Sequence, residues 1–380
     1  MNASQNILIL TSDTGGGHRS AATALEHSFN TVNPGRVVVN ITQVLEEAHI
    51  LTRRFAELYN YLLRHHQGAM KYYYWYIEKF RLNESPFIFR GALRYGRRLF
   101  EKFCPTAIVS VHPMTHHFYA YMLKKLGLLG EIPLFAVVTD PVRGFWRSWA
   151  CHDVDRYFVA SEEAKQQLLE YGIEPERIHI LGMPVHRRFH PVTEAEQRQI
   201  RQSMGLDPEK FTVCFNAGWI GGGNIPKIME QLLPADLDIQ VLFLTGHNDQ
   251  LLEQAEKWTE TARFPFYPMG YTDQMPKIMN ASDVMVTKMG GLTTFEALAS
   301  QLPIIADVVT PPMPQEMATA DFIEREGAGI LLHNPGDIIS VVQSLMNDVN
   351  RRVAIREASL RCGMPGASDR IAEAILHQIR

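Results

Sequence analysis

Short apolar runs recur along the chain and alternate with segments of helical periodicity. In the first half, the apolar runs are residues 7–10, 37–41, 107–111, 134–138 and 157–160. In the second half, they are residues 212–216, 240–245, 283–287 and 304–306. The helical patterns between these later runs are residues 249–261, 292–300 and 317–326. Apolar runs without alternation predict strands of a parallel sheet covered on both faces, and their alternation with helices predicts βαβ units.

A polar stretch, residues 191–210, holds few large apolar residues and separates the two halves. A chain of 380 residues has room for two or three domains of ordinary size. We therefore predict an α/β fold of two Rossmann-like, doubly wound domains facing a central cleft, where a ligand would bind. The first domain is expected at residues 1–190 and the second at residues 191–355. Residues 356–380 are expected to form a helix that packs back on the first domain.

Composition and charge narrow the function only slightly. The net charge of −4 gives no overall reason to expect nucleic-acid binding. The four cysteines are far apart and form no CxxC spacing, which fits a reducing compartment. The N-terminus lacks the basic region of a signal peptide, and no apolar run approaches the roughly 18 residues of a membrane span. We therefore expect a cytoplasmic protein that contacts a bilayer only at its surface.

Residues 53–102 form a basic, aromatic segment. Eleven Lys or Arg and four Glu give it a local charge of +7, and it holds thirteen of the 37 aromatic side chains. Anionic headgroups attract basic side chains and aromatic rings settle at the bilayer interface, so Tyr73, Trp75, Arg94 and Arg97 are candidate membrane contacts. Two amphipathic helices with aromatic core residues would produce the same pattern. Stacking on nucleic-acid bases is a third interpretation, which the lack of an RRM or KH signature disfavours.

A glycine turn with a histidine, Thr-Gly-Gly-Gly-His-Arg-Ser at residues 14–20, lies between the first predicted strand and a helix. It is neither a Walker A loop nor a GxGxxG motif. Gly15, Gly16 and Gly17 allow a ligand to approach the backbone at the helix start. The positive end of the helix disfavours imidazolium, so we expect His18 to be neutral and a candidate general base. The alternative is a tight turn followed by a solvent-facing histidine.

A second glycine turn follows the third predicted strand of the second half. Lys288 ends that strand, and Gly290 and Gly291 precede a helix. The free N–H groups at such a helix start suit a pyrophosphate, and Thr293 adds a hydroxyl. Glu296 lies about one turn into the helix, where its carboxylate can bond both hydroxyls of a ribose. The alternative is a capped helix with an acidic residue near its start.

Further loops are expected at the same edge of this sheet, because the carboxyl ends of parallel strands meet there. Three of them contain glycine and follow strand candidates, and a fourth opens a helix after a proline-rich loop. The candidate donor-binding residues in the first three are Gly218, Gly246, Asn248, Gly270 and Tyr271. The fourth loop supplies Gln315 and Glu316, whose amide and carboxylate can bond sugar hydroxyls or, alternatively, serve only the helix start.

Taken in order, these motifs resemble the inverting GT-B glycosyltransferases of the family that holds monogalactosyldiacylglycerol synthase, the processive diacylglycerol glucosyltransferases and the peptidoglycan enzyme MurG. The resemblance spans most of the chain and rests on residues 12–18, 138–140, 155–160, 182–185, 270–271, 287–288, 293–297 and 315–316. Order and spacing are more similar to the glycolipid synthases than to MurG. The resemblance implies that the first domain binds a lipid acceptor and the membrane, and that the second domain binds a UDP-sugar.

The resemblance also implies roles for single residues. His18 is implied as the catalytic base, and Asp140 or Asp13 as the group that orients it or as the base instead. The backbone near Tyr271 is implied to bind uracil, and Glu296 is implied to bind the ribose. Neither a metal nor another cofactor is implied, which fits the lack of a DxD motif.

The implied reaction is the synthesis of a glycolipid. A hexose from UDP-glucose or UDP-galactose would pass to the hydroxyl of 1,2-diacylglycerol with inversion. The enzyme would act at the anionic inner face of the cell membrane, without nucleic acid as a partner. The alternatives are a UDP-sugar 2-epimerase, a glycosyltransferase acting on a polyprenyl-type lipid carrier, and a membrane-bound UDP-sugar sensor without activity.

The chain departs from the family pattern at three places. Residues 290–293 are Gly-Gly-Leu-Thr, where the family has Gly-Pro-Gly-Thr. Thr319 stands where the family has an asparagine, and residues 141–146 replace the commoner loop that contains a histidine. These departures leave the expected fold unchanged and bear on the choice of sugar and on the acceptor pocket.

Overall fold

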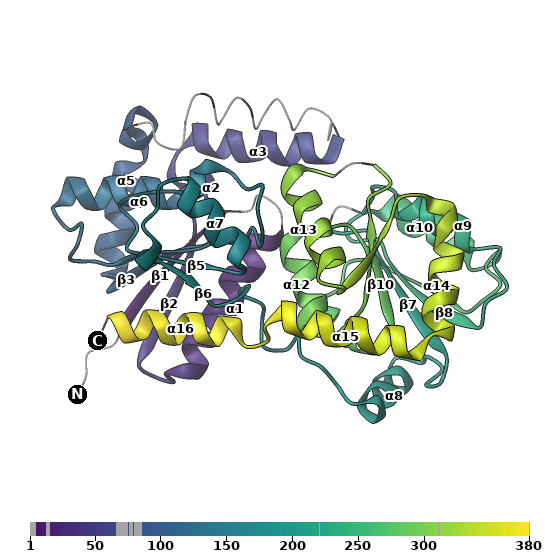
Figure 1. Cartoon of the computed structure of the whole chain (residues 1–380). Helices are drawn as coiled ribbons and strands as arrows, with labels where there is room; N and C mark the ends of the chain where they lie inside the picture. The colour runs from purple at the N-terminus through teal and green to yellow at the C-terminus, as the bar shows by residue number, and fades with distance from the viewer. Residues whose placement is uncertain are drawn as a thin grey trace. The chain divides into compact units, whose positions relative to one another are not determined.

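The chain folds into two compact units (Figure 1), each described here by itself. A computed structural model describes residues 5–12, 16–65, 75, 79, 86–219, 221–310 and 312–379. The first unit comprises Met1–Arg187 and Gly366–Arg380, and the second comprises Arg188–Pro365. Each unit contains one six-stranded parallel sheet with helices between its strands. This architecture confirms the predicted α/β class with two Rossmann-like, doubly wound sheets.

In the first unit, the strands lie in the order β2-β1-β3-β4-β5-β6, and every pair is parallel. The strands are β1 (Gln5–Thr11), β2 (Val37–Gln43), β3 (Ala107–Ser110), β4 (Leu134–Val137), β5 (Arg156–Val159) and β6 (Ile178–Ile180). The helices are α1 (Gly16–Val32), α2 (Val44–Ala48), α3 (Ile50–His65), α5 (Pro86–Phe103), α6 (Thr115–Leu126), α7 (Glu162–Glu170) and α16 (Ala367–Gln378). The strand order reverses between β1 and β3, which makes this pair the topological switch point.

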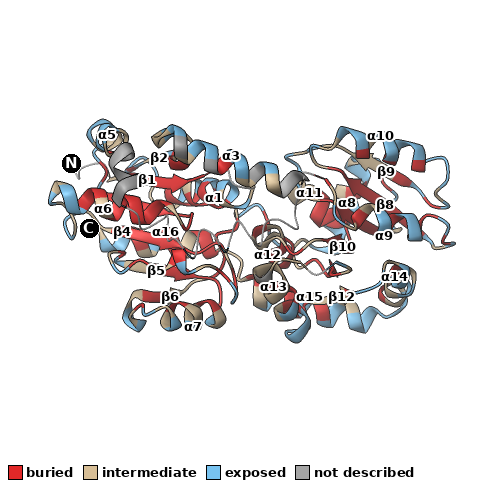
Figure 2. Cartoon of the chain, turned by 90° about the horizontal axis from the view of Figure 1, so that it is seen from above, coloured by how far each residue is buried: buried red, intermediate tan, exposed pale blue. Residues whose placement is uncertain are grey.

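The central strand β1 is apolar from Ile7 to Leu10 because both faces of the sheet are covered there. Ile7 and Ile9 belong to a core with residues of α1 and α16, whereas Leu8 and Leu10 belong to a second core with residues of α6. Successive side chains of a strand point to opposite faces, so a strand buried on both faces needs apolar residues throughout. Figure 2 shows this burial along the strands.

In the second unit, the strands lie in the order β12-β11-β10-β7-β8-β9, again all parallel. The strands are β7 (Phe211–Asn216), β8 (Ile239–Leu244), β9 (Phe266–Met269), β10 (Val284–Thr287), β11 (Ile304–Asp307) and β12 (Gly329–Leu332). The helices are α8 (Glu194–Ser203), α9 (Ile225–Leu232), α10 (Asp249–Trp258), α11 (Met275–Ala281), α12 (Gly291–Ala299), α13 (Pro314–Arg325), α14 (Ile338–Asn347) and α15 (Val349–Gly363). Here the switch point lies between β7 and β10.

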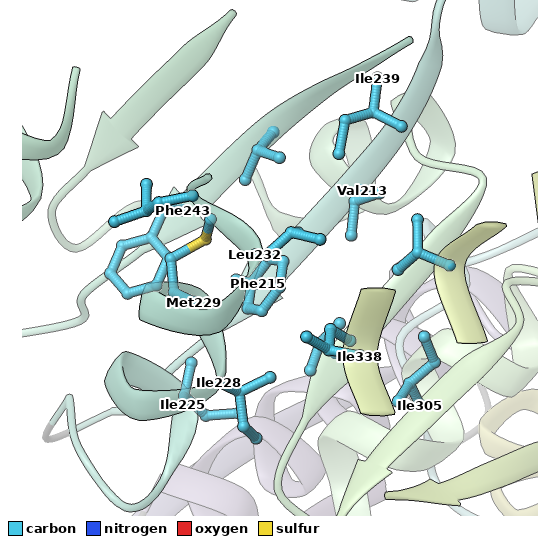
Figure 3. Close-up of a cluster of buried hydrophobic side chains, with 14 of the residues drawn as sticks. Val213, Phe215, Ile225, Ile228, Met229, Leu232, Ile239, Phe243, Ile305 and Ile338 are labelled. Carbon is cyan, nitrogen blue, oxygen red and sulfur yellow. The ribbon is translucent and has the colours of Figure 1, made fainter. Parts of the chain in front are cut away.

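One face of this second sheet is covered by α9 and α14. Phe215 of β7 and Phe243 of β8 pack with Ile228 of α9 and Ile338 of α14 in one hydrophobic cluster (Figure 3). All four side chains are fully buried. This core fixes the strands whose carboxyl ends support the loops described below.

The C-terminal region differs from the expected single helix over residues 356–380. Residues 356–363 belong to α15, which packs against α12 of the second unit. Only α16 packs in the first unit, where Ile371 and Ile375 join the core beside α1. The break between the two helices lies at residues 364–366: Met364 ends α15 with a left-handed backbone, and Gly366, also left-handed, directly precedes α16.

Three strands were not predicted from the apolar runs: β6, β9 and β12. Each lies at or next to an outer edge of its sheet, and most of their residues are only partly buried. A strand buried on one side needs no continuous apolar run, so the pattern that found the central strands could not find these.

Candidate active site

His18 lies at the switch point of the first sheet, in the first turn of α1. Its Nδ1 is 2.8 Å from the carbonyl oxygen of Val111, which follows β3, and 2.9 Å from Oγ1 of Thr139, which follows β4. A carbonyl oxygen can only accept a hydrogen bond, so Nδ1 carries the hydrogen and donates it to Val111. In the neutral ring, Nε2 is then left with a free lone pair.

The surroundings of His18 favour its uncharged form. Burial lowers the pKa of His18, and this effect outweighs the opposing influences of the Asp140 carboxyl group and the Val111 carbonyl. Burial likewise raises the pKa of Asp140, against the hydrogen bond from Trp149 and the charge of His18. The Trp149 Nε1–H donates to Oδ2 of Asp140 over 2.7 Å. A neutral imidazole with a free Nε2 has the form that a general base requires.

Three further histidines near His18 were missed in the sequence. The rings of His18 and His112 are 4.6 Å apart, edge to face. His116 and His117 both donate from Nε2 to the carbonyl oxygen of Ser148, at 3.0 and 2.9 Å. Burial holds the pKa values of His112 and His116 well below the ordinary value. His18 is therefore half-buried, with the ring of His112 beside it, rather than pointing freely into solvent.

In the second unit, the loops after β7 and β8 pack backbone to backbone. A Cβ atom on Gly221 would lie 2.0 Å from the carbonyl oxygen of Thr245, and one on Gly246 would lie 2.2 Å from that of Gly218. The Asn248 side chain donates to the Gly221 carbonyl over 2.9 Å. Gly218, Gly221 and Gly246 also have positive φ values, which only glycine adopts readily. The predicted Gly218, Gly246 and Asn248 therefore belong, together with Gly221, to one tightly packed loop pair.

Three aromatic rings lie together on the same sheet edge. Trp219 follows β7, His247 follows β8 and Tyr271 follows β9, beside the predicted Gly270. His247 stacks on Tyr271 with ring centroids 4.3 Å apart, and Trp219 meets both rings edge-on. Trp219 and Tyr271 remain 44% and 55% exposed. An exposed aromatic cluster held by rigid loops is suited to stacking on a planar ring.

Across the switch point from these loops, α12 begins after β10. Gly290 precedes the helix in extended conformation, and Gly291 is its first residue. The first N–H groups of a helix have no partner within it, so this end attracts anions. Thr293 lies in the first turn. Burial raises the pKa of Glu296 to about 8, against the influence of Arg188, so this carboxyl group holds a proton at neutral pH.

Lys288 and the start of α13 lie next to this helix end. Burial lowers the pKa of Lys288, and the carboxylates of Glu316 and Asp307 oppose this effect. Glu316 also accepts a hydrogen bond from the Met313 N–H over 3.3 Å, as a helix-capping residue does. Gln315 is partly buried beside it. The sheet order therefore places Gln315 and Glu316, Lys288 and the glycine loops in sequence along one edge.

The glycine turn before His18 is described only in part. Gly16 and Gly17 open α1, whereas Gly15 and Asp13 lie outside the described residues, as does Tyr73.

The basic, aromatic segment serves partly as core. On α5, Leu93 and Phe100 pack against the first unit's core, while Arg94 and Arg97 lie on the exposed face. Trp75 is 56% exposed. Among the described residues, none of the helices has both the length and the apolar character needed to cross a membrane. The structure thus gives α5 an apolar inner face and a basic outer face, as the amphipathic-helix interpretation predicts, and contact of the outer face with a membrane stays a prediction.

Comparison with known proteins identifies the family. Residues 18–185 match the family model for monogalactosyldiacylglycerol (MGDG) synthase, and residues 223–357 match the C-terminal domain of glycosyltransferase family 28. The chain thus carries an MGDG synthase domain followed by a glycosyltransferase family 28 C-terminal domain. The resemblance inferred from the sequence motifs is thereby confirmed.

Curated relatives extend over the whole chain. The chain is 27% identical to a processive diacylglycerol beta-glucosyltransferase of Bacillus licheniformis, covering 100% of this chain and 96% of the relative. It is 28% identical to the "Probable monogalactosyldiacylglycerol synthase 2, chloroplastic" of Oryza sativa subsp. japonica, covering 88% and 72%.

Solved structures share the fold. Acinetobacter baumannii MurG aligns with a TM-score of 0.62 at 13% identity, covering 98% of this chain and 99% of that one. The UDP-GlcNAc 2-epimerase of Neisseria meningitidis, solved with UDP-GlcNAc, aligns with a TM-score of 0.63 at 13% identity, covering 98% and 100%. These structures support the GT-B fold of both units, and the curated relatives do not favour the 2-epimerase alternative.

The packing of the glycine loops predicts a contrast between neighbours. Gly221→Ala places a methyl group against the Thr245 carbonyl and strains a positive φ, so we expect the Tm to fall by several degrees and UDP affinity to fall at least tenfold. Gly222→Ala is the matched control, since its Cβ would meet open space. Thermal unfolding and UDP titration of both variants check this. Equal behaviour of the two would contradict the described loop packing.

Proposed function

We propose that this chain is a glycolipid synthase that transfers a hexose from UDP-glucose or UDP-galactose to the hydroxyl of 1,2-diacylglycerol, with inversion. The supporting observation is His18, a half-buried imidazole whose Nδ1–H donates to Val111 and whose Nε2 is therefore unprotonated in the neutral ring. The names of the curated relatives support diacylglycerol as acceptor and a hexose as the transferred group. They favour this acceptor over a polyprenyl-type carrier.

The proposed chemistry is a single displacement. Nε2 of His18 takes the proton of the lipid hydroxyl while that oxygen forms a bond to the anomeric carbon. The bond from this carbon to the β-phosphate oxygen breaks, and UDP leaves from the opposite face. The Val111 carbonyl orients the ring, and Asp140, held by Trp149, would stabilise the imidazolium that forms, so we assign Asp140 an electrostatic role rather than that of base. The start of α12 and Lys288 would meet the charge on the leaving UDP.

The donor would lie along the carboxyl edge of the second sheet. Uracil would bind the backbone near Tyr271 and stack on the cluster of Trp219, His247 and Tyr271. Because the Glu296 carboxyl group is protonated at neutral pH in the free protein, it can donate one hydrogen bond and accept another from the ribose hydroxyls. Gln315, with Glu316 beyond its capping bond, would contact the sugar.

We further propose that transfer needs no metal, since the charge of UDP would be met by the helix end and Lys288. The described residues include no group of three or more His, Cys, Asp or Glu side chains arranged to hold a metal ion. We also propose that the enzyme acts on the anionic inner face of the cell membrane, with the basic outer face of α5 toward the lipid headgroups.

The role of His18 predicts the outcome of a variant. His18→Ala should lower the turnover of UDP-hexose with diacylglycerol by about 10²–10⁴-fold while leaving UDP affinity unchanged, because only proton transfer is lost. His27→Ala on the same helix is the matched control, since His27 is exposed. Thin-layer chromatography of labelled lipid products, with EDTA present throughout, measures both. Near-wild-type turnover in His18→Ala would exclude His18 as the base, and loss of wild-type activity in EDTA would contradict metal independence.

The same assay should show a pH dependence with a defined sign. His18 acts only when unprotonated, so kcat/KM should fall as the pH drops through its lowered pKa. The acid limb should therefore lie below pH 6.5, the ordinary histidine value. An acid limb above that value would contradict the buried, neutral environment assigned to His18.

Membrane contact is tested with the double variant Arg94→Gln/Arg97→Gln. Each basic side chain near an anionic surface contributes about 1 kcal/mol, so binding to vesicles of anionic phospholipid at low salt should weaken at least tenfold. Lys227→Gln/Lys257→Gln removes two exposed charges from the second unit and serves as the control. Vesicle co-sedimentation gives the comparison. Equal binding by both double variants would contradict a role for α5.

A further inference from the structure

A buried carboxylate, Asp307, links two loops across the switch point of the second sheet. Asp307 ends β11 and is 5% exposed. It accepts hydrogen bonds from the side-chain amide of Asn224 at 3.1 and 3.3 Å, from the Asn224 backbone N–H at 3.3 Å and from the Val309 N–H at 3.2 Å. The Thr310 hydroxyl donates to the remaining Asn224 oxygen over 3.1 Å. Because β10 lies between β11 and β7, this link passes over the end of β10.

Lys288, which follows β10, is enclosed beside this link. A Cβ atom on Gly223 would lie 2.7 Å from Cε and 3.3 Å from Nζ of Lys288, so the absence of a side chain at Gly223 makes room for the lysine. Gly223 directly precedes Asn224, so Asp307 fastens the loop that encloses Lys288. The acidic groups that act on the ammonium come from two elements, Asp307 of β11 and Glu316 of α13.

The ammonium of Lys288 is available for an anionic ligand. Within the described part of the chain, it takes part in no hydrogen bond and no ion pair with Asp307 or Glu316. A cation enclosed by protein without a direct partner is poorly solvated, so an anion that reaches it gains a strong interaction. The adjoining start of α12 favours the same kind of ligand, a diphosphate.

We propose that Asp307 is a positioning residue of the donor site, which fastens the loop of Gly223 and Asn224 over Lys288 and holds Lys288 as the cation that receives the donor's diphosphate. This inference rests on the proposed function and deepens it. Asp307 does not touch the ligand itself and acts through its two neighbours. No sequence motif pointed to it, since it is a single acidic residue at the end of a strand.

The charge of Lys288 determines how UDP affinity should depend on pH. Lys288 binds a diphosphate only when protonated, so UDP affinity should fall as the pH rises through the pKa of Lys288, which burial already places below its ordinary value. Removing the Asp307 carboxylate removes one of the two groups that oppose this lowering. In Asp307→Asn, the fall in UDP affinity should therefore begin about one pH unit lower than in the wild type.

The experiment is calorimetric titration of UDP between pH 6 and pH 10 with the full chain and four variants. Asp307→Asn should show the shifted alkaline fall. Lys288→Met should bind UDP weakly. Any remaining fall of its UDP affinity at high pH should come from the uracil ring, which loses its own proton in this range. In the Lys288→Met background, Asp307→Asn should cause no further shift, because the carboxylate acts through Lys288.

Asp283→Asn separates positioning from simple destabilisation. Asp283 precedes β10 at the opposite end of the sheet, where its carboxylate pairs with Arg201 at 2.6 Å and accepts from the Thr212 N–H. This variant should unfold at a lower temperature without moving the alkaline fall. If the UDP affinity of Asp307→Asn fell at the same pH as that of the wild type, or if Asp283→Asn showed an equal shift, the inference would be overturned while the proposed function would stand. A wild-type chain that binds no UDP would overturn the proposed function as well.

Discussion

Both candidate sites depend on one constraint: in a doubly wound parallel sheet, the loops that follow the two central strands separate at the switch point and leave backbone groups accessible there. In the first unit, His18 and Val111 follow β1 and β3 and meet across this point. In the second unit, Gly223 and Lys288 follow β7 and β10 and meet in the same way. The covered sheets keep these strand ends fixed, so the chemistry rests on the core.

Burial at these positions favours the uncharged form of each group, which removes the proton from a basic group and retains it on an acidic one. Desolvation lowers the pKa of the His18 imidazole and favours the unprotonated form that a base needs, whereas it raises the pKa of the Glu296 carboxyl group to about 8 and favours the protonated form that donates a hydrogen bond. Lys288 would also lose its proton, but two carboxylates oppose this change. The uncharged base in one unit and the retained cation in the other are the two states that a transfer from a nucleotide diphosphate to a neutral alcohol requires.

The sequence was sufficient to predict the central strands, because β1, β7 and β10 are buried on both faces and each contains a run of mostly apolar residues. It was not sufficient for β9 or β12, whose partly buried residues show no such run. The division of the C-terminal region into α15 and α16 was also missed, since a helical pattern does not show which core a helix joins.

The candidate residues were predictable where a motif marked them, which was a glycine turn for most and a helix start after a proline-rich loop for Gln315 and Glu316. His18 and Lys288 stand next to glycine turns, and these turns marked them in the sequence. His112 and Asp307 are single residues that follow or end a strand without a motif, and Trp219 is one aromatic residue in a loop that was singled out for its glycines. Their importance arises from neighbours on other strands, which a chain position alone does not reveal.

The stereochemistry of the product tests the central claim most directly, because one displacement by an alcohol activated at His18 must invert the anomeric carbon. The measurement is the proton NMR spectrum of the glycolipid formed from diacylglycerol and each UDP-α-hexose in turn. A β-linked glycolipid from at least one donor is the predicted result. An α-linked product, or hexose release without any lipid product, would contradict the account.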